Sequence, residues 1–208
     1  MFAREGRRLT RAVYDRIARL YDLLDLPFEH GRYRPLRKHL FAGVRGRVLD
    51  AGCGTGRNFA YYPPGADVIG VDLSPAMLAR AVKRQTRLGL SVPLLEMDVC
   101  RTSFPDETFD FAVASFLFCV LPNERQPEAL AEIKRVLKPG GEIRMLEYTW
   151  STDPVRRAVQ KLWEPWVARV YGAGFDRETD RFTREAGFRD VEETFLYADI
   201  IKLIRARK

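Results

Sequence analysis

The chain has 208 residues, of which 46% are hydrophobic and 30% are charged, as expected for one soluble globular domain. Three widely spaced cysteines and only two histidines exclude a multi-histidine metal centre and give no disulfide framework, so we expect no metal site. No apolar run could span a bilayer, and the N-terminus is too charged for a secretory signal, so we expect a cytoplasmic protein.

The formal net charge of +7 is concentrated near the N-terminus. Residues 1–38 contain ten basic and five acidic side chains, which account for five of the seven excess positive charges. This imbalance favours an anionic partner, either a membrane or a nucleic acid, although a solvated helix face would explain the same charges.

Residues 7–24 are predicted to form an amphipathic helix, because their apolar side chains recur at helical spacing. The apolar stripe consists of Leu9, Val13, Ile17, Leu20 and Leu24. Such a basic helix either lies on a membrane surface, which would make the protein peripheral to the membrane, or packs its stripe on the domain core. The sequence leaves both readings open.

From residue 45 onward, apolar strands alternate with amphipathic helices, which indicates βαβ units and a parallel sheet. The expected strands are 47–52, 67–72, 92–98, 109–116 and 142–149. The expected helices are 74–89 and 124–137. Ser74 can cap the first helix, Pro75 fits its first turn, and Gly89 can end it.

After residue 149 the pattern changes to a helical insert and a final strand pair. A helix over 153–174 is expected to be interrupted near Pro165, a second helix is expected over 176–187, and two strands share 188–208. A late strand pair favours one antiparallel edge strand. The fold class is therefore α/β: a Rossmann-like, doubly wound, seven-stranded, mostly parallel sheet. We divide this single domain into an N-terminal helical cap (1–44), a cofactor-binding core (45–149), and the insert with the strand pair (150–208).

The segment from Val48 to Asp72 places three glycines, at positions 52, 54 and 56, between two apolar strands. Glycine lets the backbone take positive φ and approach a ligand closely. A ligand at this turn would meet free N–H groups and the positive end of a helix. The carboxylate of Asp72, which ends the second strand, would hold a ribose diol.

The pattern differs from the dinucleotide fingerprint GxGxxG, whose third glycine would fall at Arg57. "VLDAGCGTG", "VIGVDLSPAML", "LLEMDV", "FDFAVASF" and "RVLKPGGEIRMLE" together resemble the class I S-adenosylmethionine-dependent methyltransferases, from about residue 10 to the C-terminus. The resemblance implies S-adenosyl-L-methionine as cofactor and S-adenosyl-L-homocysteine as product.

The resemblance also implies cofactor-binding roles, residue by residue. Asp50 and the glycine turn would hold the methionine end, Asp72 the ribose, and Asp98 the adenine amino group. Ser115 and Phe116 would face the sulfonium. The full implied set is Tyr14, Tyr21, Asp50, Gly52, Cys53, Gly54, Gly56, Asn58, Asp72, Leu73, Met77, Asp98, Val99, Ser115 and Phe116. For the apolar members, core packing is the alternative.

Methyl transfer is an in-line displacement that needs an aligned nucleophile and, for an amine, loss of a proton. The candidate catalytic groups are Tyr21, Glu147 and Tyr148. Glu147 and Tyr148 end the fifth strand, at the rim where ligands bind, although Tyr148 is equally explained as a strand-end aromatic. Tyr21 is implied by "YDRIARLYDLL", which resembles the opening of quinone-biosynthesis C-methyltransferases and bacterial phosphatidylethanolamine N-methyltransferases.

An apolar acceptor is favoured by the insert, whose bulky side chains would either roof an acceptor pocket or belong to the core. These side chains are Leu162, Trp163, Trp166, Val170 and Tyr171. Quinone enzymes commonly have histidines after the fourth strand, where this chain has Leu117, Phe118 and Cys119.

The favoured function is N-methylation of phosphatidylethanolamine at a membrane surface. The alternatives are C- or S-methylation of a quinone precursor or small thiol, and a non-catalytic protein that binds S-adenosylmethionine. No nucleic-acid partner is expected, because the fourth strand lacks a [DN]-P-P-[YFW] motif and no RNA-binding appendage is visible.

Overall fold

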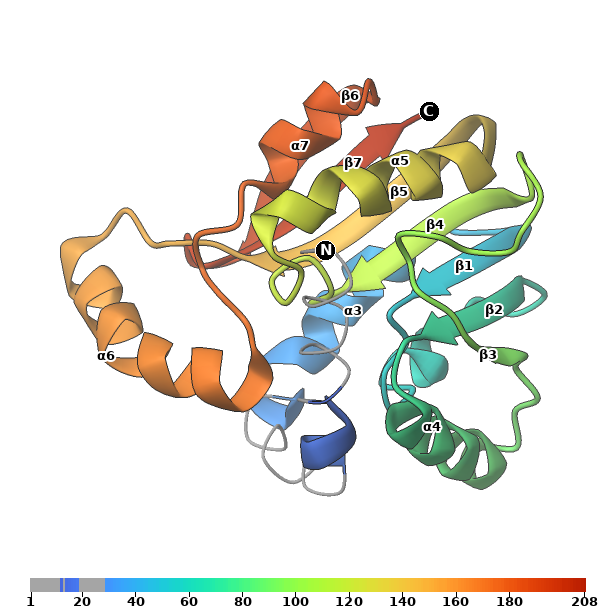
Figure 1. The fold of residues 1–208 in the computed structure, drawn as a ribbon, viewed down its shortest axis with the longest axis horizontal. Helices are drawn as coiled ribbons and strands as arrows, with labels where there is room; N and C mark the ends of the chain where they lie inside the picture. Colours follow the sequence, from blue (N-terminus) through green and yellow to red (C-terminus); the bar gives the residue numbers. More distant parts are fainter. Residues whose placement is uncertain (1–11, 13, 19–28) are drawn as a thin grey trace.

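A seven-stranded sheet forms the centre of the computed structural model, which describes residue 12 and residues 14–18 and 29–208 (Figure 1). The strands are β1 (Arg47–Ala51), β2 (Asp67–Asp72), β3 (Leu94–Glu96), β4 (Phe109–Ser115), β5 (Leu137–Tyr148), β6 (Arg189–Tyr197) and β7 (Ile201–Arg207). Their order is β3-β2-β1-β4-β5-β7-β6. Strands β1 to β5 are parallel, whereas β7 runs antiparallel to both of its neighbours, β5 and the outermost strand β6. The predicted Rossmann-like fold is confirmed.

Helices cover both faces of the sheet (Figure 1). They are η1 (Glu29–Tyr33), α3 (Arg34–Phe41), η2 (Phe59–Tyr61), α4 (Pro75–Leu88), η3 (Asn123–Arg125), α5 (Gln126–Val136), α6 (Pro154–Tyr171) and α7 (Thr179–Glu185). Successive residues of β1 serve opposite faces: Val48 packs in the cluster under α3, and Leu49 packs in the cluster under α5 and α7. Burial on both faces explains why the strands are apolar almost without interruption.

The ends of α4 follow the capping residues read from the sequence. The Ser74 hydroxyl accepts a hydrogen bond from the backbone N–H of Met77, at 3.2 Å. Pro75 occupies the first turn, and Gly89 ends the helix in the left-handed conformation at φ 65°. These caps fix where α4 starts, shortly after Asp72 ends β2 at the edge of the sheet.

Two helical expectations were wrong. The glycine turn leads into the three-residue 3₁₀ helix η2 and not into a regular helix, because Pro63 and Pro64 follow almost at once. Helix α6 continues through Pro165, and Figure 1 shows it bending along its length. A mostly exposed helix can bend to accommodate the proline ring.

Residues 14–18 are helical and pack on the domain. Ile17 and Ala18 are buried against Met77 of α4, so the core-packing reading holds for this part of the predicted stripe. Leu9, Val13, Leu20 and Leu24 lie outside the described residues. Within the described part of the chain, no helix has the length and apolar character needed to cross a bilayer.

Candidate active site

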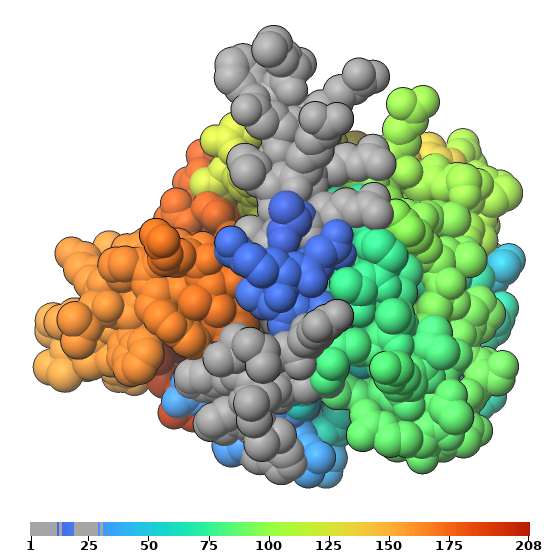
Figure 2. Space-filling view, turned by 60° about the horizontal axis from the view of Figure 1, so that its bottom comes forward, coloured from blue at the N-terminus to red at the C-terminus, as the bar shows by residue number. Residues whose placement is uncertain are grey.

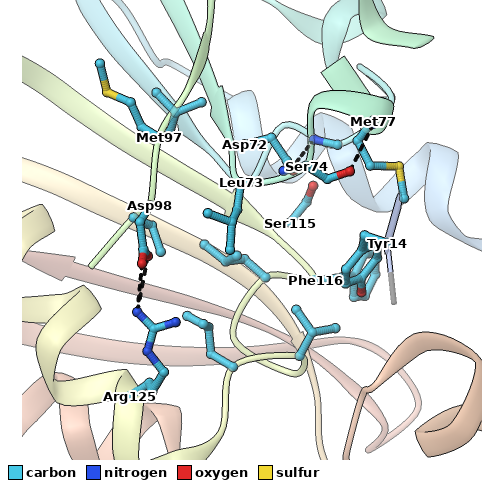
Figure 3. A pocket seen from close by; sticks show the side chains of 17 residues that line it. Tyr14, Asp72, Leu73, Ser74, Met77, Met97, Asp98, Ser115, Phe116 and Arg125 are labelled. Atoms are coloured by element: carbon cyan, nitrogen blue, oxygen red, sulfur yellow. Dashed lines mark hydrogen bonds and ion pairs between the residues drawn. The ribbon is translucent and has the colours of Figure 1, made fainter. Parts of the chain in front are cut away.

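A pocket lies at the carboxyl edge of the sheet, where the chain leaves β1, β2 and β4 (Figure 3). The order of the strands reverses between β1 and β4, and such a switch point is where open α/β sheets bind ligands. The pocket is lined by Tyr14, Gly52, Gly54, Val71, Asp72, Leu73, Ser74, Met77, Met97, Asp98, Val99, Ser115, Phe116, Leu117, Val120, Leu121 and Arg125. Ten of these residues belong to the predicted cofactor-binding set.

The glycine turn provides the floor of the pocket. Gly52 has φ 69°, and an added Cβ would lie 2.8 Å from Cδ1 of Leu117. Gly56 has φ 77°, and a Cβ there would lie 2.4 Å from the ring of Phe59. Both positions therefore need glycine for conformation and for space. The backbone N–H of Gly54 donates to Oδ2 of Asp72, at 2.9 Å, which ties the turn to the end of β2.

Asp72 is held rigidly at the pocket wall. Its Oδ1 accepts from the Ser74 N–H at 2.9 Å, and its Oδ2 accepts from Gly54. Each carboxylate oxygen can accept more than one hydrogen bond, so this geometry leaves acceptor capacity for a diol. Burial raises the pKa of Asp72 to about 6, against the opposing effect of the two backbone donors.

Asp98 and Arg125 form an ion pair at one end of the pocket, and Figure 3 shows their side chains pointing toward each other. Nη2 of Arg125 lies 3.0 Å from Oδ2 of Asp98, and both side chains are almost fully buried. The Cys100 N–H also donates to Asp98, at 3.1 Å. Part of the hydrogen-bonding capacity of Asp98 is therefore used within the protein.

The N-terminal helical segment covers the other side of the pocket. Tyr14 lines it, on the opposite side from the Asp98–Arg125 pair in Figure 3. Oδ1 of Asp15 accepts a hydrogen bond from the Ser74 hydroxyl at 2.5 Å, which joins this segment to the cap of α4. Tyr21 lies outside the described residues, and its catalytic and cofactor roles remain predictions.

Four predicted cofactor residues lie beside the pocket without lining it: Asp50, Cys53, Gly56 and Asn58. The Asp50 carboxylate accepts from Asn58 Nδ2 at 2.9 and 3.0 Å, and from the Tyr62 hydroxyl at 2.6 Å. Burial raises its pKa to about 6. Cys53 packs behind the turn against Gly70, and burial raises the pKa of its thiol well above the usual value.

Arg37 connects this buried group to the pocket. Its Nη1 donates to Oδ1 of Asn58 at 2.6 Å and to the Ser115 hydroxyl at 3.0 Å, while its Nη2 pairs with Glu29 at 3.1 Å. Ser115 lines the pocket, so Arg37 positions a pocket residue from α3. Buried charges of this kind are stable only when paired and hydrogen-bonded, as they are here.

Glu147 does not line the pocket. It is 1% exposed, and its two oxygens accept the backbone N–H groups of Phe118 and Cys119 at 2.9 and 2.8 Å. Burial raises its pKa to about 7. This placement does not support the predicted catalytic role, and it makes Glu147 an anchor for the loop that follows β4.

Tyr148 belongs to a cluster that we call the aromatic wall, formed by Tyr33, Phe116, Tyr148 and Phe175. Neighbouring ring centroids lie 4.7 Å apart for Tyr33 and Phe116, 5.2 Å for Phe116 and Tyr148, and 5.6 Å for Tyr148 and Phe175. The hydroxyls of Tyr33 and Tyr148 are hydrogen-bonded to each other. Tyr33 and Phe175 are buried, whereas Phe116 lines the pocket, so the aromatic wall backs one side of the pocket with an apolar cluster that carries two hydroxyls.

Sequence reasoning missed Arg125 and Arg37. Arg125 is the last residue of η3, directly before α5, so the topology places it at the edge of the pocket. Its pairing with Asp98 depends on the short helix η3, which the sequence did not predict. In the sequence Arg37 is one of many N-terminal basic residues, and its burial, at 3% exposure, has no local sequence signal. Among the described residues, no three His, Cys, Asp or Glu side chains gather as a metal site.

Known proteins share both the sequence pattern and the fold. The family described as "Methyltransferase domain" matches residues 48–141. A ubiquinone/menaquinone biosynthesis C-methyltransferase of Syntrophotalea carbinolica is 38% identical over 155 residues, covering 70% of this chain and 64% of the relative. A phosphatidylethanolamine N-methyltransferase of Cereibacter sphaeroides is 36% identical over 154 residues, covering 72% of this chain and 73% of the relative.

A crystal structure of an S-adenosylmethionine-dependent methyltransferase from Thermotoga maritima shares the fold, with a TM-score of 0.70 and 23% identity over 95% of this chain and 99% of that one. The fold and its carboxyl-edge pocket define a Rossmann-like methyltransferase architecture. The chain belongs to the class I S-adenosylmethionine-dependent methyltransferases, an enzyme family whose cofactor is S-adenosylmethionine. It spans only 64% of the length of the quinone-biosynthesis relative.

Proposed function

We propose that the protein transfers the methyl group of S-adenosylmethionine to the amine of phosphatidylethanolamine at a membrane surface. The observation that carries the proposal is the aromatic wall beside the pocket, because aromatic faces attract alkylated ammonium groups. The wall also offers a hydroxyl, that of Tyr148, as a hydrogen-bond acceptor for an amine. The relative that methylates phosphatidylethanolamine supports the same acceptor, and this chain covers 73% of it.

The pocket residues fit the cofactor. Gly52 and Gly54 bring the backbone of the turn to the pocket wall, and Asp72 keeps acceptor capacity for the ribose hydroxyls. Apolar side chains of Leu73, Met77 and Val99 line the part of the pocket that would receive the adenine. When bound, S-adenosylmethionine supplies an electrophilic methyl group on a sulfonium.

The acceptor would enter beside Phe116, the member of the aromatic wall that lines the pocket. After its ammonium has lost a proton to water, the amine would donate a hydrogen bond to the Tyr148 hydroxyl, which Tyr33 holds in place. This bond would aim the nitrogen lone pair at the methyl group, and alignment is the main contribution that such a displacement needs. Ser115, which accepts a hydrogen bond from Arg37, lines the pocket next to Phe116.

A quinone precursor is the alternative acceptor, supported by the 38% identical relative. An aromatic ring would also stack on the wall. The loop after β4 favours phosphatidylethanolamine, because it has Leu117, Phe118 and Cys119 where quinone-biosynthesis enzymes commonly have histidines. The Cys119 thiol is buried, and burial raises its pKa well above the usual value.

The basic N-terminal segment would add affinity for an anionic membrane. Each arginine close to such a surface contributes roughly 1 kcal/mol. Arg7, Arg8 and Arg11 lie outside the described residues, so this part of the proposal rests on the sequence alone.

The test is transfer of labelled methyl from S-adenosylmethionine into a total lipid extract, followed by separation by head group. We expect label in methylated derivatives of phosphatidylethanolamine, and none with an Asp72→Ala variant. Label in the neutral quinone fraction would establish the alternative. Tight cofactor binding without label in any fraction would overturn both lipid proposals and favour a soluble thiol or amine.

A further inference from the structure

Helix α6 carries a row of exposed apolar side chains. Of its eighteen residues only Gln160 is buried. The exposed fractions are 72% for Val155, 51% for Val159, 79% for Leu162, 51% for Trp163 and 37% for Trp166. Spacings of four, three, one and three residues place these five side chains on one face, which we call the α6 stripe. They are therefore exposed and not part of the core, contrary to one of the two readings that the sequence allowed for Leu162 and the two tryptophans.

The orientation of α6 is fixed by its inner side. Gln160 accepts from the Ser151 N–H at 2.7 Å and donates to the Thr149 carbonyl at 2.9 Å. Asp153 caps the first turn by accepting from the N–H of Arg156 at 2.9 Å. These bonds tie the polar face of the helix to the end of β5, so the α6 stripe points away from the sheet.

The charge of α6 complements an anionic surface. The helix contains four basic residues and one acid: Arg156, Arg157, Lys161, Arg169 and Glu164. At 100° per residue, Arg156 and Arg169 lie on the two sides of the α6 stripe. An apolar face that contains tryptophan and is bordered by cations is the pattern of helices that lie in a bilayer interface.

The C-terminal end of α6 lies beside the helical segment that covers the pocket. Tyr171, at the end of α6, packs in the cluster of Ile17, Ala18 and Met77, next to the pocket residue Tyr14. Figure 2 shows α6 in orange projecting beside the blue helical segment of residues 14–18. A surface that contacted the α6 stripe would therefore lie next to the segment that covers the pocket.

We propose that the α6 stripe docks on an anionic phospholipid bilayer and so presents the pocket to membrane-embedded acceptors. The inference rests on the proposed function for its acceptor, but binding to a bilayer can be measured without any acceptor or cofactor. It makes α6 a contact distinct from the basic N-terminal segment. Exposing five apolar side chains to water is unfavourable for a folded protein. Docking on a bilayer would explain why α6 exposes them.

The test is sedimentation of the full chain with sucrose-loaded vesicles of equal phosphatidylglycerol and phosphatidylcholine, compared with pure phosphatidylcholine. We expect binding to the anionic vesicles, at least about tenfold weaker for V155S/L162S and for L162S/W163S, because each lost side chain removes apolar burial. The matched control is V82S/L88S, which removes exposed apolar side chains from α4 and should bind like the wild type. Melting temperatures verify that each variant is folded.

A second readout uses the tryptophans, two of which lie in the α6 stripe. Their emission should shift to shorter wavelength when anionic vesicles are added, and W163F/W166F should abolish the shift while keeping most of the binding. No vesicle binding by the wild type would overturn the proposal. Undiminished binding by V155S/L162S, with loss in R7Q/R8Q/R11Q, would overturn it in favour of the N-terminal segment. A wild-type dimer in sedimentation velocity that V155S/L162S converts to a monomer would overturn it in favour of a second copy.

Failure of this inference can be separated from failure of the proposed function. Methyl transfer to phosphatidylethanolamine in detergent micelles reports on the pocket without a bilayer. A wild-type protein that does not bind vesicles but is active in micelles would contradict α6 docking alone. Vesicle binding that depends on the α6 stripe, without transfer to phosphatidylethanolamine, would contradict only the acceptor.

Discussion

Asp72 is the residue on which cofactor affinity should depend most. Replacing it with alanine would remove the proposed acceptor for two ribose hydroxyls, and hydrogen bonds to a charged group contribute about 1.5–3 kcal/mol each. We expect Asp72→Ala to weaken S-adenosylmethionine binding by about a hundredfold, measured by isothermal titration calorimetry. Asp67→Ala, at the exposed start of β2, is the matched control. Unchanged affinity in Asp72→Ala would show that the ribose is held elsewhere.

The raised pKa of Asp72 predicts a pH dependence for the same equilibrium. The carboxylate would accept both ribose hydroxyls only when ionised, and burial raises its pKa to about 6. Cofactor affinity should therefore be constant above pH 7 and fall by about tenfold per unit as the pH decreases below 6. Calorimetry between pH 5 and pH 8 measures this. The Asp72→Ala variant should show a flat profile, and a steep one there would assign the titration to another group.

Tyr148 should affect turnover and not cofactor binding. Tyr148→Phe keeps the ring in the aromatic wall but removes the hydroxyl that would orient the acceptor. We expect kcat to fall by at least about tenfold with the Kd for S-adenosylmethionine unchanged, since positioned polar groups contribute factors of this order or more. Tyr33→Phe, which removes only the supporting hydroxyl, should have a smaller effect. Equal rates for Tyr148→Phe and the wild type would reduce Tyr148 to a packing residue.

At the scale of elements, Glu147 links β5 to the loop that follows β4. Glu147→Ala leaves the buried N–H groups of Phe118 and Cys119 without an acceptor, at a cost of about 1–3 kcal/mol each. We expect a loss of roughly 2–5 kcal/mol in the free energy of unfolding, measured in urea, together with weaker cofactor binding, because Leu117 in this loop lines the pocket. Glu147→Gln keeps one acceptor and should lose less.

If Glu147 were the catalytic base instead, the two substitutions would behave differently. Both would abolish turnover, and Glu147→Gln would leave stability and cofactor affinity near those of the wild type. Graded losses of stability and affinity, with kcat retained in Glu147→Gln, support the anchoring role.

The elements that the sequence predicted well are those with strong local signals. Helix α4 has both caps in its own sequence, and the strands β1 and β4 are apolar because both of their faces are buried. Signals of this kind are local. The short helix η2 was missed because the glycine turn resembles the start of a regular helix, and the prolines at 63 and 64 weighed too little.

The site residues also divide into those that the sequence predicts and those that only the structure reveals. Asp72, Asp98 and Ser115 were predictable because each follows or ends a strand, so topology alone brings them to one edge. The pairing of Asp98 with Arg125, the Arg37 network and the occupied oxygens of Glu147 depend on contacts between residues far apart in the chain. No spacing rule in a single sequence records such contacts.

The stability of the whole molecule should have a maximum at mildly acidic pH. Burial raises the pKa of Asp50 and of Asp72 to about 6 and that of Glu147 to about 7, above their unfolded values near 4. Between about pH 4 and pH 7 the folded state therefore holds more protons than the unfolded state. Stability that is fully present below the unfolded pKa is lost as these groups ionise on raising the pH.

Carboxylates with lowered pKa act in the opposite direction at lower pH. The pKa of Asp110 is lowered by its hydrogen bond with Lys138, and that of Asp199 by the hydroxyl of Ser151. Their contribution is present above the unfolded pKa and is lost as the pH falls through their folded pKa. The net charge of +7 grows on acidification, and the added repulsion acts in the same sense. The maximum should therefore lie near pH 4–5.

Urea unfolding followed by circular dichroism from pH 3 to pH 8 measures the curve. We expect the free energy of unfolding to fall by at least about 3 kcal/mol between pH 4.5 and pH 7.5, since each unit of pKa shift corresponds to about 1.4 kcal/mol. Saturating S-adenosylmethionine should flatten the fall, because binding favours the ionised form of Asp72. Stability that rises over this range would mean that the buried carboxylates are ionised at lower pH than their burial implies, and it would also remove the basis for the predicted loss of cofactor affinity below pH 6.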